Sequence, residues 1–268
     1  MRSHASCCVD MARPRALSRR LLRQVLCLLA PTLVAGGAWA SGGAWTEALR
    51  TRDTAALERL AADRAAPVDA GLADGTTALM VAARQGPPSL VHRLIALGAD
   101  VRAENTRGGT ALMYAAVSGD TGVLALLLDH GARVGQRASN GWTALTIAAA
   151  KGRTAAVRLL LARGADPNGA DIYGGTPLIR AVEGGYEETA RVLLDAGGID
   201  VDAEDESGAT ALHHAAANGD PALVRLLLRH GADASHRTGS GLTPLDVARM
   251  QGQSDVASEL RGARDPSG

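Results

Sequence analysis

The chain has 268 residues, of which 46% are apolar but only 2% aromatic, and it contains no phenylalanine. This composition argues against a single globular core, which normally uses large rings, and favours thin helices packed through alanine and leucine. Residues 1–40 hold six arginines and one aspartate, a net charge of +5, so the rest of this neutral chain carries −5. A mildly acidic remainder of mixed sign argues against nucleic acid as the main ligand.

Residues 1–40 have the pattern of a secretory signal peptide. A basic segment that includes Arg19-Arg20 precedes the apolar run 25–34, and Ala38-Trp39-Ala40 offers small residues at both cleavage positions. All three cysteines lie in this segment, so the remaining chain can form no disulfide in an oxidising compartment. The sequence therefore predicts cleavage after Ala40 and a periplasmic or secreted protein with no stable membrane span.

Three alternatives stay open for this segment. It could be kept as a membrane anchor, although Pro31 and Gly36-Gly37 make it a poor span of ~20 apolar residues. Residues 18–22 resemble a twin-arginine signal, but a protein without a cofactor has no need to cross a membrane folded. Met11 could be the true start, because the basic segment proper begins there.

Residues 41–70 are predicted to form a linker and a degenerate repeat that caps the N-terminal end of the fold. Ala48, Leu49, Leu57 and Leu60 have helical spacing, but the segment lacks the threonine that begins each later unit. A capping unit shields the apolar face of the first full repeat.

A unit of about 33 residues then repeats through 71–260. Within 207–237, two short apolar helical patterns are separated by Gly219, Asp220 is placed to cap the second helix, and Gly231 ends it in a left-handed conformation. Such a unit cannot bury its own apolar faces, so it must stack on copies of itself. The marker threonines, spaced by 33, 33, 33, 34 and 33 residues, are Thr77, Thr110, Thr143, Thr176, Thr210 and Thr243.

We therefore predict an all-α repeat solenoid of five full units and a C-terminal cap, followed by a disordered tail at 261–268. The motifs resemble the ankyrin repeat, whose signature is a Thr-Pro-Leu-His-x-Ala run. Parts of it occur at Thr176-Pro177-Leu178, at Thr243-Pro244-Leu245, at Leu212-His213 before Ala215, and in the Gly-Ala-Asp triplets that begin at 98, 164 and 231. The resemblance covers about Leu72 to Leu260. It implies an ankyrin-type stack of helix–turn–helix units with β-turn fingers, whose concave face grips folded protein partners.

No catalytic or metal-binding constellation is found in the sequence. The rings of His213 and His214 point about 100° apart on a helix, and the resemblance implies that His213 hydrogen-bonds the neighbouring turn. The acidic run 200–206 lacks the glycine and the helix pair of a calcium loop. No Lys-Ser/Thr pair follows the glycine pairs at 108–109 and 174–175, so these are turns rather than phosphate loops. We predict a monomer without enzymatic activity, metal or cofactor.

The resemblance also places the partner-binding site, at the residues before each threonine and at the end of each first helix. Trp142 and Tyr173 fall on adjacent fingers of a chain poor in aromatics, and aromatics and arginine dominate interface hot spots. The alternative is that Trp142 packs on its neighbouring turn. The predicted site is centred on Trp142, Tyr173, Arg107 and Lys151 and flanked by Arg84, Asn140, Glu183, Glu206 and Asn218.

One finger departs from the family pattern, because Ala138 stands where an aspartate usually opens the turn. This predicts a looser finger around Trp142. The predicted function is a non-catalytic protein-binding module acting in the periplasm. The alternative is an accessory factor that stabilises or protects a specific exported enzyme, or a secreted factor that acts on another cell.

Overall fold

A computed structural model describes residues 44–62 and 68–264 of the chain. Over these two ranges the chain forms fourteen helices and no β-strand. The helices come in antiparallel pairs, one pair for each unit. The pairs are α2 (Ala44–Thr51) and α3 (Thr54–Leu60), α4 (Ala78–Gln85) and α5 (Pro88–Ala96), α6 (Ala111–Ser118) and α7 (Thr121–Asp129), α8 (Ala144–Ala150) and α9 (Thr154–Ala162), α10 (Pro177–Glu183) and α11 (Glu187–Asp195), α12 (Ala211–Asn218) and α13 (Pro221–Arg229), and α14 (Pro244–Met250) and α15 (Ser254–Arg264).

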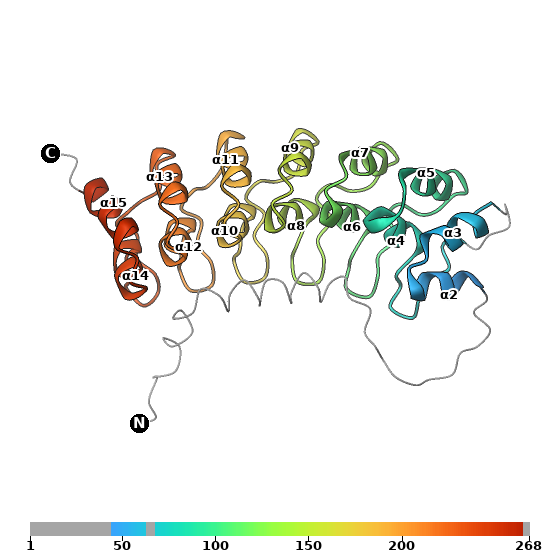
Figure 1. Cartoon of the computed structure of the whole chain (residues 1–268), viewed down its shortest axis with the longest axis horizontal. Coiled ribbons are helices and arrows are strands. Elements are labelled where there is room, and N and C mark those ends of the chain that lie inside the picture. The colour runs from blue at the N-terminus through green and yellow to red at the C-terminus, as the bar shows by residue number, and fades with distance from the viewer. Residues whose placement is uncertain (1–43, 63–67, 265–268) are drawn as a thin grey trace, which may run out of the picture.

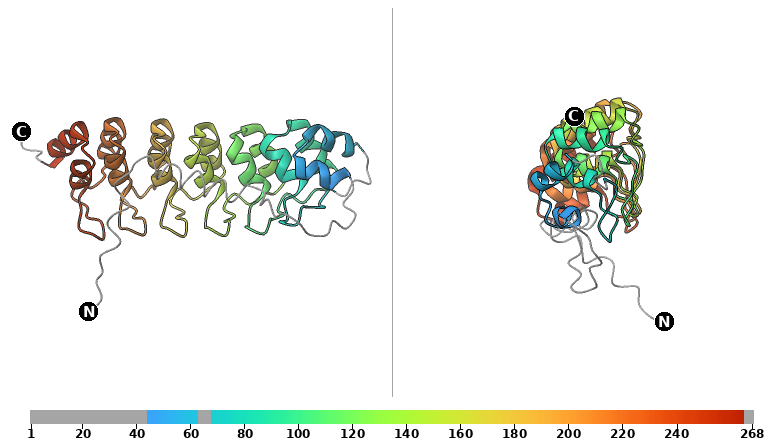
Figure 2. Two further views of the ribbon diagram at one scale, coloured as in Figure 1. Left: turned by 60° about the horizontal axis from the view of Figure 1, so that its bottom comes forward. Right: turned by 90° about the vertical axis from the view of Figure 1, so that its right-hand side faces the viewer.

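The pairs stack side by side into an elongated solenoid (Figure 1). From α4 onward, the first helix of each pair packs on the first helices of its neighbours, and the second helices form a parallel row above them. From α4 onward, a turn precedes each first helix and projects from the same side of the stack (Figure 2). We call these turns fingers; they span 71–76, 104–109, 137–142, 170–175, 204–209 and 237–242. The surface made by the fingers and the first helices is the concave face.

The marker threonines begin the first helices, as the sequence predicts. Each has extended backbone, and in all but Thr210 the hydroxyl accepts a hydrogen bond from the backbone N–H three residues later, as in Thr110 with Met113 at 3.4 Å. Asp220 caps α13 ahead of Pro221, and Gly231 follows that helix with φ at +89°. The predicted all-α repeat solenoid is thus confirmed, because the same capping residues start and end the helices of successive units.

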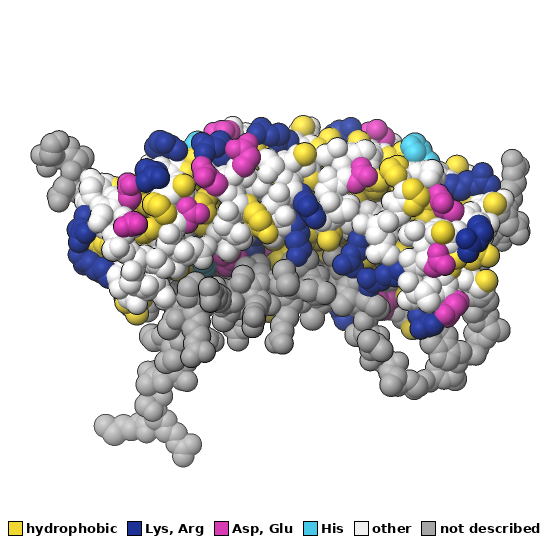
Figure 3. All heavy atoms as spheres, in the orientation of Figure 1, with side chains coloured by type: hydrophobic (Ala, Val, Ile, Leu, Met, Phe, Trp, Pro, Cys, Tyr) yellow, Lys and Arg dark blue, Asp and Glu magenta, His cyan; other side chains and the backbone are white. Residues whose placement is uncertain are grey.

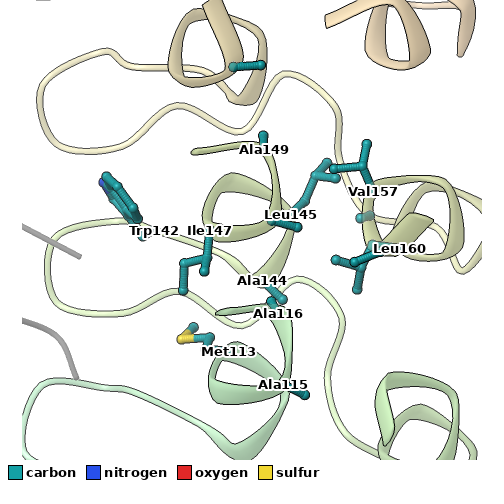
Figure 4. Close-up of a cluster of buried hydrophobic side chains, with 14 of the residues drawn as sticks. Met113, Ala115, Ala116, Trp142, Ala144, Leu145, Ile147, Ala149, Val157 and Leu160 are labelled. Atoms are coloured by element: carbon teal, nitrogen blue, oxygen red, sulfur yellow. The ribbon is translucent and has the colours of Figure 1, made fainter. Parts of the chain in front are cut away.

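The core lies between the two rows of helices. Leu127, Leu160 and Leu193 of the second helices are fully buried, as predicted. In Figure 4, Leu145 of α8 points toward Val157 and Leu160 of α9. Small residues such as Ala116 and Ala144 line the approach of neighbouring first helices. Alanine at these positions lets thin helices pack closely, which accounts for a core of this length without phenylalanine.

Adjacent fingers are joined by one backbone hydrogen bond at each step. Together with the stacked helices, these bonds hold the fingers in one row, so their tips form a continuous edge of the concave face. The donors and acceptors are Thr106 N–H to Asp74 O (2.8 Å), Ser139 to Arg107 (2.9 Å), Ile172 to Asn140 (3.1 Å), Glu206 to Tyr173 (2.9 Å) and Gly239 to Ser207 (2.8 Å).

At the N-terminal end, α2 and α3 pack on each other, and α3 also packs on α4 and α5. At the C-terminal end, α15 continues to Arg264, so the predicted start of a disordered tail at 261 is wrong. The predicted signal peptide, 1–40, and the last four residues lie outside the described ranges. Among the helices of 44–62 and 68–264, none combines the length and the apolar character that a membrane crossing requires.

Candidate protein-binding face

Trp142, the predicted centre of the site, is fully buried with 0% of its surface exposed. The prediction that its ring faces a partner is therefore wrong, and the alternative, packing on the neighbouring turn, is correct. The reason lies in the repeat geometry: the residue before each threonine points inward, between its own finger and the next unit. In the five full units this position is buried throughout, at Thr76, Gly109, Trp142, Gly175 and Ala209.

The indole of Trp142 lies against a buried ion pair of the next unit. Its Nε1–H donates to Asp171 Oδ2 at 2.8 Å, and the Arg180 guanidinium lies 5.7 Å from the ring centroid. Arg180 Nη2 and Asp171 Oδ2 are 2.5 Å apart, with 8% and 0% of the two side chains exposed. Arg180 fills the space beside Gly175, where a Cβ would collide with the guanidinium. Figure 4 shows the indole extending from its finger toward the neighbouring finger.

Other units also pair the residue that opens the finger with the residue nine positions later. Asp171 opens its finger, and Arg180 lies nine residues later on the first helix of the same unit. In the same positions, Asn105 Nδ2 donates to Tyr114 Oη at 3.2 Å, and His214 Nε2 donates to Asp205 Oδ2 at 2.8 Å. The third unit has an apolar combination here, Ala138 and Ile147, both buried. Sequence reasoning missed these pairs, although the nine-residue spacing between complementary side chains was a signal that could have found them.

In the fourth and fifth units the pairs join into one network beneath the concave face. Arg180 Nη1 donates to Glu183 Oε2 at 2.9 Å, and Glu183 Oε1 lies 3.8 Å from His214 Nδ1. Burial opposes a charge on His214, but its hydrogen bond to Asp205 and the charge of Glu183 outweigh this and raise its pKa. Burial would likewise raise the pKa of Asp205, yet its bond with His214 holds that pKa far below the ordinary range. The structure thus favours a charged His214–Asp205 pair.

This pair predicts a stability difference that depends on pH. The raised pKa of His214 means that its stabilisation is complete below the ordinary value of 6.5 and is lost as the pH rises through the raised pKa. The lowered pKa of Asp205 means that its contribution is present above 3.8 and is lost at more acidic pH. We therefore expect His214→Gln to destabilise the protein most between pH 3.8 and 6.5 and less in alkaline solution.

Urea unfolding of the wild type and of His214→Gln at several pH values tests this. His213 acts in the opposite direction, because burial lowers its pKa. The effect of burial is common to both proteins, whereas the smaller lowering caused by the charge of His214 is lost in His214→Gln. A destabilisation by His214→Gln that does not change with pH would show that the pair is not charged in the folded protein.

The remaining predicted residues divide by where their side chains point. Tyr173 is 38% exposed at a finger tip, beside Ile172 at 61%. Glu183 is turned inward to Arg180, and Asn218 Nδ2 donates to Val182 O of the preceding unit at 2.9 Å. Both therefore hold neighbouring parts of the stack together. The other predicted residues are partly or fully exposed on the concave face; they are Arg84, Arg107, Asn140, Lys151 and Glu206.

The finger that lacks an opening aspartate is closed by other bonds. Ala138 N–H donates to Trp142 O at 2.8 Å, and Asn140 Oδ1 accepts from Trp142 N–H at 3.1 Å. Asn140 thus replaces part of what an aspartate at position 138 would supply. The finger has a defined turn and a buried indole, so the structure gives no support to the expectation of a looser geometry.

The histidine predicted to be structural is confirmed in that role. His213 Nδ1 accepts from Thr210 N–H at 3.2 Å, and its Nε2 lies 3.1 Å from Leu242 O in the next finger. In the acidic run 200–206, Asp200 and Asp202 accept backbone N–H groups, Glu204 lies 3.1 Å from His236, and Asp205 binds His214. Residues 44–62 and 68–264 contain no cluster of three or more His, Cys, Asp or Glu side chains that could hold a metal ion.

Comparison with known families agrees with this architecture. A family model described as ankyrin repeats in three copies matches residues 47–138 and 132–205. A second one, described as ankyrin repeats in many copies, matches residues 193–248. Together they cover the stack from α2 to α14, including the units that carry the buried network. The chain belongs to the ankyrin repeat family.

Proposed function

We propose that this protein is a non-catalytic module that binds a protein partner in the periplasm through its concave face. Ankyrin repeats generally serve as protein–protein interaction modules. The observation that carries the proposal is the pair Ile172 and Tyr173, two large apolar side chains exposed side by side at a finger tip. Exposed aromatics on a rigid scaffold are typical hot spots, and the backbone bonds on both sides of this tip fix its position.

The site is revised by one residue from what the sequence predicts. Ile172 takes the place of Trp142 as the second apolar anchor, and the buried indole supports the tip from below through Asp171. Asp171 Oδ1 accepts from Tyr173 N–H at 2.9 Å, so the tip is tied directly to the buried ion pair. The tip is already ordered before a partner binds. Binding would therefore cost this protein little conformational entropy.

A paired substitution tests this proposal. Replacing Ile172 and Tyr173 with serine should weaken partner binding by about 1–3 kcal/mol, because it removes both apolar anchors. The fold should be kept, because both side chains lie outside the core. Captures from a periplasmic extract with the wild type and the variant would be compared by quantitative mass spectrometry. Met250→Ser, another exposed apolar residue on a different unit, is the matched control. Equal recovery of every protein by the wild type and the paired variant would exclude this tip as the anchor.

The periplasmic location is part of the proposal and rests on the basic segment, apolar run and Ala-x-Ala site of residues 1–40. We expect the protein isolated from its native host to begin at Ser41, which N-terminal mass spectrometry would show. A chain that begins at Met1 or Met11 in a soluble cytoplasmic fraction would exclude both cleavage and export.

A second candidate function is an accessory factor that stabilises or protects one exported enzyme, or a secreted factor that acts on another cell. The same tip would serve these roles, so they differ only in the partner. Identification of the protein lost from the Ile172/Tyr173 variant's capture would decide among them.

A further inference from the structure

The finger 204–209 is ordered by one carboxylate, that of Asp205. Its Oδ1 accepts from Ser207 N–H at 2.8 Å, from Ser207 Oγ–H at 2.6 Å and from Ala209 N–H at 3.0 Å. Its Oδ2 accepts from His214 Nε2 at 2.8 Å, which ties the finger to helix α12. The protonation state of His214 therefore bears directly on how this finger is held.

The imidazole of His214 faces a carboxylate on each ring nitrogen. Nε2 bonds to Asp205, and Nδ1 lies 3.8 Å from Glu183 Oε1 on α10 of the preceding unit. The charged ring has a proton on both nitrogens and suits both carboxylates. The neutral ring has one proton, so it must turn a lone pair toward one of them. Loss of the proton thus makes one of the two contacts repulsive.

The groups around His214 carry an excess of negative charge. When His214 is charged, it and Arg180 are two cations among the three anions Asp171, Glu183 and Asp205, a net charge of −1. When His214 is neutral, the same set has a net charge of −2. Each of these side chains is at most 16% exposed, so water screens the added repulsion weakly.

The other elements packed on α12 direct their charges elsewhere. These elements are α13 and α14. Their charged groups cap their own helices (Asp220 and Asp246), pair with another helix (Arg225 with Glu259) or lie exposed in solvent (Arg229 and Arg249). On α12 itself, the His213 ring is turned to Leu242 O and to His236 of the next unit. The carboxylates of Asp205 and Glu183 therefore dominate the surroundings of His214.

The charges on the second helices form exposed pairs instead. In Figure 3, acidic and basic side chains are interspersed over the row of second helices. In the pairs Arg158–Glu188 and Arg163–Asp129, at least 36% of each side chain is exposed. Exposed pairs contribute little to stability. A single proton has a larger effect in the enclosed network around His214.

Both ends of this network reach the backbone of Tyr173 at the exposed tip. Tyr173 N–H donates to Asp171 Oδ1 at 2.9 Å, and Tyr173 O accepts from Glu206 N–H at 2.9 Å. His214 lies on the far side of the closed network that results, so a change there reaches Tyr173 in both directions. In order, the members of the closed network are Tyr173, Asp171, Arg180, Glu183, His214, Asp205 and Glu206.

We propose that His214 is a pH switch: its protonated imidazole holds the Ile172/Tyr173 tip in the position that binds the partner, and loss of the proton loosens the tip. The inference rests on the proposed binding function and adds its regulation. Burial opposes the charge of His214, but the bond to Asp205 and the charge of Glu183 raise its pKa above 6.5. The ordered tip is therefore favoured at low pH and is lost as the pH rises through the raised pKa.

Linkage sets the size of the effect. For each pH unit by which the ordered tip raises the pKa of His214, complete deprotonation shifts the equilibrium toward the loosened tip about tenfold. The midpoint of the His214 titration and the loosening of the tip are thus two measurements of one quantity.

NMR spectroscopy of the purified chain from about pH 5 to about pH 9 tests the switch without a partner. The Cε1–H signal of His214 should titrate with a midpoint above 6.5. Protection of Glu206 N–H against hydrogen exchange, corrected for the intrinsic rate at each pH, should fall as this signal titrates. Thr106 N–H makes the same bond between fingers, to Asp74 O at 2.8 Å, and its protection should stay constant.

Three variants make the result specific. In His214→Gln, the protection of Glu206 should lose its dependence on pH. Glu183→Gln removes the second carboxylate and should lower the midpoint of His214 by about one pH unit. His92→Gln changes an exposed histidine on α5 and should keep the response of the wild type. Circular dichroism would verify that every variant keeps its helices.

A His214 midpoint at or below 6.5, or protection of Glu206 that does not change as His214 titrates, would overturn the proposal. An equal loss of protection at Thr106 would overturn it as well, because the whole stack would then be loosening. Capture of the proteins that depend on Ile172 and Tyr173 should fall from low to high pH for the wild type and not for His214→Gln. If Glu206 responds to His214 while the Ile172/Tyr173 variant loses no protein, the switch stands and the proposed function fails.

Discussion

Replacing Asp171 with alanine is expected to lower the free energy of unfolding by about 3–5 kcal/mol, because it breaks a buried ion pair and leaves Glu183 as the one carboxylate paired with Arg180 among the described residues. Asp171 Oδ2 accepts from Arg180 and from the indole of Trp142, and its Oδ1 accepts two backbone N–H groups of the finger. The change therefore leaves several buried donors unsatisfied at once. Urea unfolding monitored by circular dichroism would measure the loss.

Two further variants make this result specific. Asp166→Ala removes an exposed aspartate that caps a loop through Asn168 N–H, so a much smaller loss is expected there. The double variant Asp171→Ala with Arg180→Ile copies the Ala138 and Ile147 combination of the third unit and removes the buried cation as well. It should be more stable than Asp171→Ala alone. A double variant that is the less stable of the two would mean that Arg180 stabilises the fold mainly through Glu183 and Trp142.

Leu160→Ala is expected to cost about 2–5 kcal/mol, because it opens a cavity in the shared core of the second helices. Leu160 is fully buried on α9, between α8 of its own unit and the neighbouring second helices α7 and α11. In a solenoid each unit contacts only its neighbours, so the loss should appear first in the units that flank α9. Hydrogen exchange followed by mass spectrometry would locate the loosened segments.

Leu161→Ala is the matched control, since the next residue on the same helix is only partly buried. It should cost less and should leave the exchange pattern of distant units unchanged. Equal loosening of α4 and α14 by Leu160→Ala would contradict a fold stabilised by nearest neighbours and would indicate one cooperative unit.

The sequence by itself determined the repeat, the fold and the ends of most helices. The threonines, the leucine pairs and the glycines after the second helices recur at one period, and the threonines and glycines have local physical roles that need no distant partner. Thr110 caps its helix and Gly231 adopts positive φ because of bonds within one unit. The N-cap Asp220 followed from the same local reasoning. Such features depend on neighbours in the chain, so their spacing alone predicts them.

Only the tertiary structure decided which way Trp142 points and what lies beneath the concave face. The position before each threonine packs against the next unit. Trp142, for example, binds Asp171, which lies 29 residues later in the chain, so the burial of its ring depends on a contact between units. The pairing of Asp171 with Arg180 likewise requires a finger to fold back on its own helix. Side chains of one type can face solvent or core at such positions, because their environment is set by residues that come together only when the units stack.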